Sequence, residues 1–166
     1  ETAIKIARKW GSDVKGIAEN QGEIIAMNGN FHGRTLGALS LSSQESYKKG
    51  FGPLLDNMQY MDFGDITRLK SLINENTTAI VLEPIQGEGG VNVPPDYFIQ
   101  EVRNLCDEHN VLFIADEIQV GLGRTGKMFA MEHFGIDPDL TCVGKSIGGG
   151  LPISGVVGKA SIIDTV

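Results

Sequence analysis

Three charged residues stand at the ends of apolar runs, where a side chain can reach a ligand. Glu83 follows TAIVL (78–82), Asp116 closes LFIAD (112–116), and Lys145 comes one glycine after LTCV (140–143). Apolar runs of this kind predict buried strands, and an open parallel sheet binds its ligands beyond the carboxyl ends of its strands. The three residues are therefore expected either to share one site or to be the solvated ends of three separate strands.

Lys145 lies between a predicted buried strand and the glycine turn SIGGG (146–150). Burial at such a junction disfavours the charged ammonium group and lowers the pKa of a lysine. A neutral amine can attack an aldehyde and form a Schiff base. Lysine also occupies such junctions as an ordinary structural residue, so the catalytic hypothesis depends on what lies beside it.

Asp116 supplies that second group. An enzyme that uses pyridoxal phosphate keeps the ring nitrogen protonated with a carboxylate, because the pyridinium is the electron sink for the substrate carbanion. The ring also needs a flat apolar cover, and Phe31, which follows the run EIIAM (23–27), is a candidate. Lys145, Asp116 and Phe31 together predict a cofactor clamped by an amine, an acid and an aromatic ring.

The segment GLGRTGK (121–127) fits two phosphate-binding fingerprints, G-x-G-x-x-G and G-x-x-x-x-G-K. The first requires an acid about 20 residues on, at the end of a second strand, whereas Asp137 and Asp139 fall in a loop that contains a proline. The second requires Ser or Thr after the lysine to hold magnesium, and Met128 stands there. A nucleotide site is the alternative to a glycine-rich surface loop in which Arg124 forms a local ion pair.

The composition excludes several classes of protein. The chain has 166 residues, 41% of them hydrophobic and 21% charged, with a formal net charge of −7, which describes one globular core of ordinary size. The acidity argues against a nucleic-acid partner, and no apolar run reaches the roughly 20 residues that span a bilayer. The histidines lie far apart and no C-x-x-C occurs, so no metal site is expected. Cys106 and Cys142 are expected to be buried free thiols of a reducing compartment.

Alternating helices and strands are predicted to position these residues. Strands are expected over 23–27, 59–63, 78–85 and 111–118, and helices up to about Gly11, over 65–73 and over 96–109. Residues 31–53 are expected to form a short helix and a long loop, and 140–158 further short strands and turns. Strands that alternate with helices imply parallel pairing, so the expected fold class is α/β, in a single domain without a linker.

Four motifs of the chain resemble those of a known family, in order and in approximate spacing. They are NFHGRT (30–35), EPIQGEGG (83–90), LFIADEIQVGLGRTGK (112–127) and GKSIGGGLPIS (144–154), and they resemble the class III, or ω-amino-acid, aminotransferases. The resemblance implies the large domain of a fold-type I pyridoxal-phosphate transferase, with a mainly parallel seven-stranded sheet. Residues 1–166 would be the central part of that domain, without the N-terminal segment and the small C-terminal domain. A homodimer with its active site at the subunit interface is also implied.

The resemblance gives roles to residues that bind the cofactor, pyridoxal 5'-phosphate. Lys145 is implied as the Schiff-base lysine and proton shuttle, and Asp116 as the partner of the pyridine nitrogen. Gln119 would hydrogen-bond the phenolic oxygen of the ring. Phe31 would stack on the ring, with His32 beside it in the cofactor site.

Three more residues are implied to contact the cofactor or the substrate. Glu83 and Glu88 look like the two site glutamates of the family, Glu83 on the cofactor side and Glu88 on the substrate side. The arginine that pairs with the glutamate matching Glu88 would lie outside this chain. Arg34 is the expected contact for a substrate carboxylate, because a guanidinium fork fits a carboxylate bidentately. The loop 121–127 is structural in this family.

The implied reaction transfers an ω-amino group to 2-oxoglutarate, and three substrates stay open. ETAIKIARKWG (1–11) and SYKKGFGP (46–53) favour ornithine, which would give glutamate semialdehyde. EGGVNVPP (88–95) and residues 145–164 favour 4-aminobutyrate, and family members that act on acetylornithine share much of both patterns. His32 stands where animal members that act on ornithine often have tryptophan, a departure from that subgroup.

A truncated homologue that dimerises without catalysis is the competing hypothesis. Intact Lys145, Asp116 and Gln119 argue against it, although truncation could have the same effect as their loss. The expected partners are an amino-acid substrate and 2-oxoglutarate, with no nucleic acid and no membrane. The expected location is the bacterial cytoplasm or the mitochondrial matrix.

Overall fold

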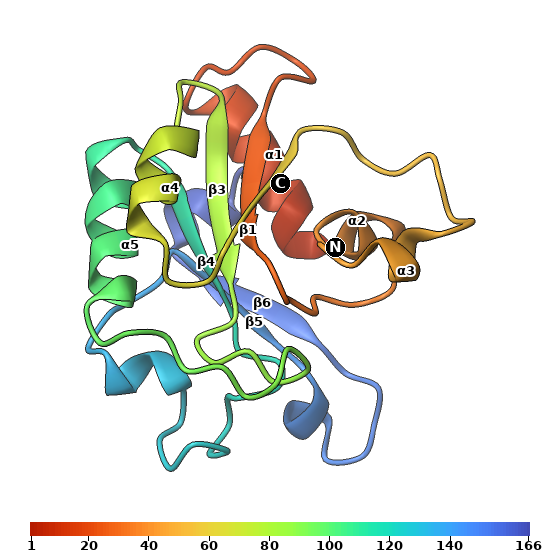
Figure 1. Ribbon diagram of the computed structural model, residues 1–166, viewed down its shortest axis with the longest axis vertical. Coiled ribbons are helices and arrows are strands. Elements are labelled where there is room, and N and C mark those ends of the chain that lie inside the picture. The colour runs from red at the N-terminus through yellow and green to blue at the C-terminus, as the bar shows by residue number, and fades with distance from the viewer.

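The computed structural model describes residues 1–166 and contains one six-stranded sheet. The strands are β1 (Glu23–Met27), β2 (Met58–Met61), β3 (Thr77–Leu82), β4 (Leu112–Asp116), β5 (Leu140–Val143) and β6 (Gly155–Gly158). They lie in the order β2-β1-β3-β4-β5-β6 (Figure 1). The first five run parallel, and β6 runs antiparallel to β5 at one edge. The predicted α/β fold with a mainly parallel sheet is confirmed, with six strands in this chain where the resemblance implied seven.

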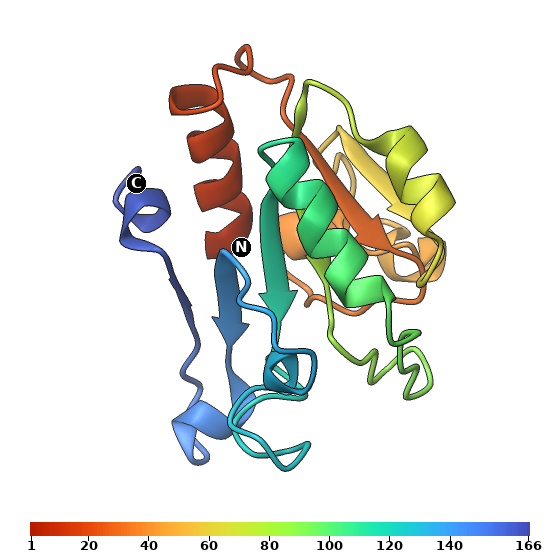
Figure 2. The ribbon, with the colours of Figure 1, turned by 90° about the vertical axis from the view of Figure 1, so that its left-hand side faces the viewer.

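Helices cover both faces of the sheet. One face carries α1 (Thr2–Asp13) and α6 (Ala160–Ile163), and the other carries α4 (Ile66–Leu72) and α5 (Phe98–Glu108) (Figures 1 and 2). The short helices α2 (Leu36–Ser40) and α3 (Glu45–Lys48) follow β1 and precede β2 along the chain. Two 3-10 helices, η1 (Ala130–His133) and η2 (Lys145–Gly148), flank β5.

Alternation along the buried strands builds the two cores. In β3, Ile80 and Leu82 face the core under α4 and α5, whereas Ala79 and Val81 face the core under α1 and α6. Successive side chains of a strand point to opposite faces, so a strand covered on both sides is apolar throughout. All six residues of β3 are buried. These two packed layers fix the sheet whose carboxyl edge carries the candidate site.

The main differences from the predicted elements lie at their ends. Helix α1 continues to Asp13 instead of ending near Gly11. Gly11 allows close packing within the helix: it lies against β3, where a Cβ atom would collide with the methyl group of Thr78. Strand β3 ends at Leu82, several residues earlier than predicted, and β4 ends at Asp116. The chain thus leaves both strands just where the acidic residues begin.

No helix of the structure is long and apolar enough to cross a membrane. Cys106 is buried and Cys142 is half-buried, and both are free thiols.

Candidate active site

The carboxyl edge of the sheet gathers residues from four strands. Phe31 lies in the loop after β1, Glu83 directly follows β3, Asp116 ends β4, and Lys145 comes two residues after β5. Asp116 pairs in register with Cys142 of β5, three residues before Lys145. Parallel strands end at the same edge, and the three charged residues expected at strand ends all lie there.

Asp116 is held by a histidine from a distant part of the chain. Its Oδ2 lies 2.7 Å from Nδ1 of His32, and its Oδ1 accepts the backbone N–H of Ile118 at 3.1 Å. The side chains of His32 and Asp116 are 3% and 8% exposed, and Nε2 of His32 is buried without a hydrogen-bond partner. A carboxylate can only accept, so a neutral His32 donates from Nδ1. The contact fixes the orientation of the acid at the end of β4.

Glu83 connects the loops that follow β1 and β3. Its Oε1 accepts the backbone N–H of Phe31 at 2.9 Å, and its Oε2 accepts that of Gly87 at 3.3 Å. Burial raises the pKa of this carboxyl group, and nearby Asp116 adds to the rise, while the two N–H donors and His32 act in the opposite direction. Both oxygens are used by the backbone, so Glu83 holds Phe31 in place from the side of β3.

Gln119 and Glu88 approach each other from two different loops. Nε2 of Gln119 donates to Oε1 of Glu88 at 3.3 Å, a long hydrogen bond between half-buried and exposed groups. The backbone at Gly87 comes so close to the Gln119 amide that a Cβ atom there would overlap its oxygen. Glycine is therefore required at position 87 if the amide of Gln119 keeps this position.

Arg34 lies against two aromatic rings. Its guanidinium carbon is 4.2 Å from the ring centroid of Tyr47 and 5.6 Å from that of Phe31. The side chain is exposed and has no carboxylate within ion-pair distance. Sequence reasoning missed Tyr47, although the signal was present as an aromatic residue in SYKKGFGP, a segment used only for the resemblance.

Lys145 adopts an unusual backbone conformation. Its φ is +46°, in the left-handed region that non-glycine residues rarely occupy, and it opens the 3-10 helix η2 after Gly144. Such conformations persist where the surrounding structure imposes them, often at functional sites. The predicted burial of Lys145 is wrong, because its side chain is exposed just after the short strand β5, which lies next to the edge strand β6. Its amine forms no hydrogen bond or ion pair within the chain.

The loop 121–127 does not have the surroundings of a phosphate loop. Such a loop opens an α-helix whose N–H groups face the phosphate, whereas this segment turns back so that Leu122 and Gly123 donate to the carbonyl of Met128. The next helical residues belong to the single 3-10 turn η1. Arg124 has no carboxylate within ion-pair distance, so its predicted local ion pair is wrong.

Glu117, next to Asp116, is a functional candidate that sequence reasoning missed. It is buried, and its carboxylate accepts the backbone N–H groups of Ala130 at 2.9 Å and Met131 at 2.8 Å. Burial raises its pKa, against the effect of the two N–H donors. The residue closes the loop that leaves β4 and so stabilises the segment carrying Gln119. The signal was the second acid in ADE (115–117).

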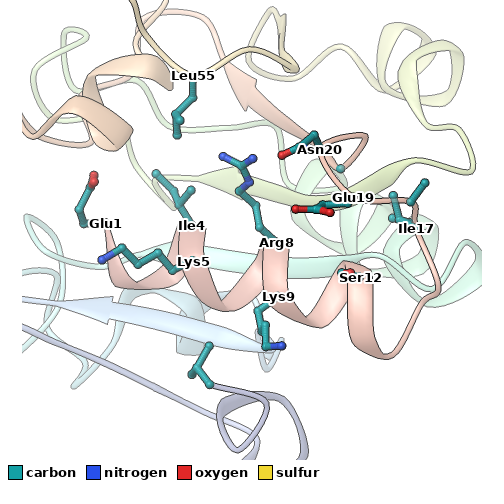
Figure 3. Close-up of a pocket in the computed structure, with 13 residues that line it drawn as sticks. Glu1, Ile4, Lys5, Arg8, Lys9, Ser12, Ile17, Glu19, Asn20 and Leu55 are labelled. Carbon is teal, nitrogen blue, oxygen red and sulfur yellow. The ribbon is translucent and has the colours of Figure 1, made fainter.

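A groove of about 520 Å³ runs along the exposed side of α1, away from these residues (Figure 3). Lys5, Arg8 and Lys9 line it, together with Glu19 and Leu55. None of the predicted site residues contributes to it. The carboxyl edge of the sheet, and not this groove, therefore remains the candidate active site.

Comparison with known protein families decides the membership of the chain. The family model described as aminotransferase class-III matches residues 1–166. The chain belongs to the class III aminotransferases. The aminotransferase resemblance drawn from the four motifs is thereby confirmed.

Relatives of this class III chain include well-matched ornithine aminotransferases. Ornithine aminotransferase 1 of Staphylococcus saprophyticus is 71% identical over 100% of this chain and 42% of its own length. A crystal structure of the Toxoplasma gondii ornithine aminotransferase, with PLP at partial occupancy in its active site, has a TM-score of 0.94 and 42% identity. It is matched over 98% of this chain and 39% of its own. An acetylornithine aminotransferase from Elizabethkingia anophelis has a TM-score of 0.80 and 37% identity over 99% of this chain and 38% of its own. The class III chain therefore spans less than half the length of these relatives.

Proposed function

We propose that the protein containing this chain is a pyridoxal-phosphate-dependent aminotransferase that moves the ω-amino group of ornithine to 2-oxoglutarate and leaves glutamate semialdehyde. The observation that carries the proposal is the buried Asp116 carboxylate, fixed by His32, on the strand adjacent to the one that leads to Lys145. A fixed acid and a free amine at the same edge of the sheet are the two groups that this chemistry needs.

The residues at the carboxyl edge fit pyridoxal phosphate by the chemistry of their donors and acceptors. Asp116 would pair with the protonated ring nitrogen, Gln119 would donate to the phenolic oxygen, and Phe31 would cover the ring. When bound, the cofactor would supply an electron sink for negative charge on the substrate carbon. The Toxoplasma gondii relative with PLP in its active site supports pyridoxal phosphate as the cofactor.

The chain's own residues would bind the substrate and move a proton. Nζ of Lys145, which has no partner in the chain, would take the proton from the substrate carbon next to the nitrogen. His32 would keep the Asp116 carboxylate in a fixed orientation, because its Nδ1 lies 2.7 Å from Oδ2 of Asp116. The exposed guanidinium of Arg34 would bind a substrate carboxylate, and Glu88 would bound the substrate side of the site next to Gln119.

Ornithine is the preferred substrate among the three that the sequence analysis left open. The 71% identity to an ornithine aminotransferase supports it. The acetylornithine aminotransferase structure, with 37% identity, keeps acetylornithine as an alternative, and 4-aminobutyrate stays a second one. A full-length protein should therefore be offered all three amines with 2-oxoglutarate, with ornithine expected to give the highest kcat/KM.

The whole protein is proposed to be a homodimer with its active site at the subunit interface. In that protein, residues 1–166 would be the central part of the cofactor-binding large domain, since each relative is matched over about two fifths of its length. The bacterial cytoplasm is the proposed location, because the 71% identical relative comes from a staphylococcus. Size-exclusion chromatography with light scattering of the full-length protein would test the dimer.

Borohydride reduction tests the proposal directly. The full-length protein would be reduced with borohydride in the presence of pyridoxal phosphate, digested, and mapped by mass spectrometry. The expected result is one pyridoxyl label on Lys145, which is lost in Lys145→Ala but kept in the matched control Lys127→Ala. A label elsewhere, or none, would refute the mechanism. A label on Lys145 without transamination of any of the three amines would support the non-catalytic homologue instead.

A further inference from the structure

We propose that Tyr47 is a positioning residue of this site, which holds the guanidinium of Arg34 against its ring and thereby sets the affinity for the substrate carboxylate. The inference rests on the proposed function and deepens it, because it adds a residue that determines which substrates the site accepts. Tyr47 lies outside the four motifs that carry the family resemblance.

The guanidinium of Arg34 lies close to two aromatic rings that also contact each other. The guanidinium carbon lies 4.2 Å from the Tyr47 centroid, closer than its 5.6 Å from the Phe31 centroid. The two rings meet edge to face, with centroids 6.3 Å apart and planes at 86°. A guanidinium stacked on a ring keeps its in-plane N–H donors free for a carboxylate. No carboxylate of the chain competes for those donors.

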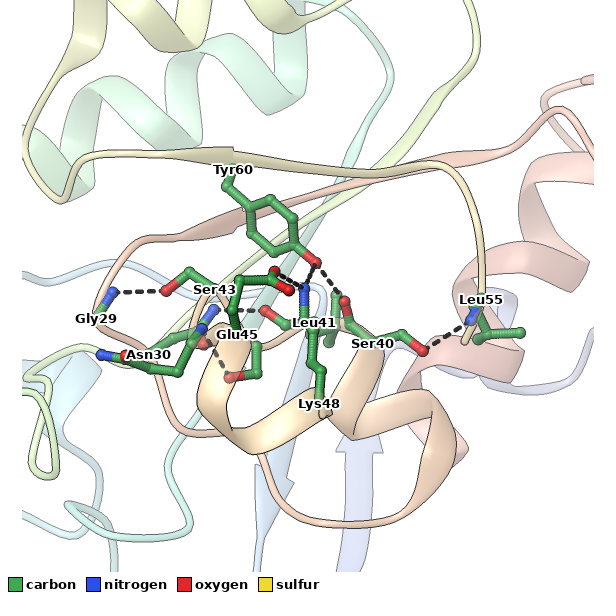
Figure 4. A network of polar contacts seen from close by, with 11 residues as sticks. Gly29, Asn30, Ser40, Leu41, Ser43, Glu45, Lys48, Leu55 and Tyr60 are labelled. Carbon is green, nitrogen blue, oxygen red and sulfur yellow. Dashed lines mark hydrogen bonds and ion pairs between the residues drawn. The ribbon is translucent and has the colours of Figure 1, made fainter. Parts of the chain in front are cut away.

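A network of polar contacts holds the segment that carries Tyr47 (Figure 4). Tyr47 lies on α3, which has only four residues and is too short to be stable alone. Its neighbour Lys48 donates to the hydroxyl of Tyr60 on β2 at 3.0 Å, and that hydroxyl donates to the carbonyl of Ser40 at the end of α2. Helix α3 is thus fastened to the sheet, and its tyrosine ring is a fixed support.

The same network reaches the loop that carries Phe31 and Arg34. The backbone N–H of Gly29 donates to Oγ of Ser43 at 3.0 Å, and the amide of Asn30 donates to the carbonyl of Leu41 at 2.8 Å. These bonds join the start of the NFHGRT motif to the segment between α2 and α3. Tyr47 and Arg34 are therefore positioned relative to each other by one set of contacts.

Tyr47 can be separated experimentally from the cofactor, whereas Phe31 cannot. Phe31 contacts Arg34 only at the longer distance and is the proposed cover of the cofactor ring. Replacing it would change cofactor binding and substrate binding together. Replacing Tyr47 removes its contact with Arg34 and its edge-to-face contact with Phe31, but no proposed contact with the cofactor, so the main effect should fall on KM.

The test compares variants of the full-length holoenzyme in steady-state kinetics. Tyr47→Leu removes the ring and is expected to raise KM for the carboxylate substrates about 2- to 30-fold, the range of a cation–π contact. The value of kcat and the borohydride label on Lys145 should stay within about twofold of wild type. Tyr47→Phe keeps the ring and should restore the wild-type KM. Tyr97→Leu makes the same change at an exposed tyrosine outside the site and should leave KM unchanged.

A double-mutant cycle distinguishes positioning of Arg34 from a general structural effect. In an Arg34→Gln background, Tyr47→Leu should change KM by less than about 1.5-fold, because the cation it supports is gone. An unchanged KM in Tyr47→Leu, or an equal rise in both backgrounds, would overturn the inference while leaving the aminotransferase proposal standing. A wild-type protein with no label and no transamination would overturn both.

Discussion

The buried carboxylate of Asp139 gives the most direct test of how the site's scaffold is held together. Asp139 immediately precedes β5, the strand that leads to Lys145. Its Oδ2 accepts the backbone N–H of Phe113 at 2.8 Å and Nη1 of Arg103 at 2.9 Å, and its Oδ1 pairs with Lys159. One acid therefore joins β4, α5 and the segment after β6. We predict that Asp139→Ala destabilises the chain more than the loss of any surface ion pair.

The magnitude follows from what each partner of Asp139 loses. The N–H of Phe113 would be buried without an acceptor, which costs about 1–3 kcal/mol. Arg103 would keep its ion pair with Asp107 at 2.6 Å. Losing Asp139 as a partner of Arg103 should therefore cost less than the roughly 3–5 kcal/mol of a fully broken buried pair. Lys159 is 56% exposed and contributes at most about 0.5 kcal/mol. The expected loss in the free energy of unfolding is about 3–4 kcal/mol.

Urea unfolding measures this loss. The chain has a single tryptophan, Trp10, which is buried on α1, so its fluorescence reports unfolding. With a slope of about 2 kcal/mol per M, the midpoint of Asp139→Ala should fall by about 1.5–2 M. The control Asp107→Ala removes only the ion pair between Arg103 and the exposed Asp107 and leaves Asp139 in place. It should shift the midpoint by less than about 0.3 M. Equal shifts in the two variants would refute the reasoning.

The pH dependence provides an independent check of the Asp139 charge. Burial raises the pKa of Asp139. The opposite effect of its three partners is larger, so the pKa lies below the ordinary 3.8; these partners are Lys159, the Phe113 N–H and Arg103. A group whose folded pKa is lowered contributes stability above its unfolded pKa, and that stability is lost as the pH falls through the folded pKa. The stability difference between wild type and Asp139→Asn should therefore be constant above about pH 5 and shrink below about pH 4. A difference that is unchanged at pH 3 would contradict this.

Three further predictions concern the loops and the thiols. Gly87→Ala should displace the Gln119 amide and lower kcat/KM of the full-length enzyme about 10- to 100-fold, and wild-type kinetics would show that the close approach does not matter. In Glu117→Gln the side chain can accept only one of the two backbone N–H groups, so trypsin should cleave the following loop about fivefold faster. An unchanged cleavage rate would show that these two hydrogen bonds do not hold the loop. Burial raises the pKa of Cys142 to about 12 and that of Cys106 further, so iodoacetamide at pH 8 should label both thiols only in urea. Labelling of the folded chain would contradict the raised pKa values of the two thiols.

The sequence predicted the main elements because their signals are local. The continuous burial of β1 and β3 is predicted by EIIAM and TAIVL, because runs of apolar and β-branched residues suit a strand covered on both faces. Strand ends were placed less well: 59–63 was predicted where β2 covers Met58–Met61. The ends depend on hydrogen bonds to neighbouring strands, which a single segment does not reveal.

The candidate site was predicted in its residue types but not in its contacts. Asp116 and Lys145 could be named because acids and lysines that follow apolar runs must lie at a strand end. The burial predicted for Lys145 was wrong, since exposure depends on how the chain turns after Gly144 and not on the preceding apolar run. Tyr47 and Glu117 were missed, because their partners approach only when the loops have folded.

The sequence alone determined the α/β class, the family and the set of chemical groups, because periodicity and motifs are properties of the chain itself. Only the tertiary structure decided how those groups act on one another. His32 and Asp116 are 84 residues apart and Phe31 and Glu83 are 52 apart, yet each pair is joined by a single hydrogen bond. Such contacts depend on strand order and loop closure, which bring the carboxyl ends of non-consecutive strands to one edge of the sheet.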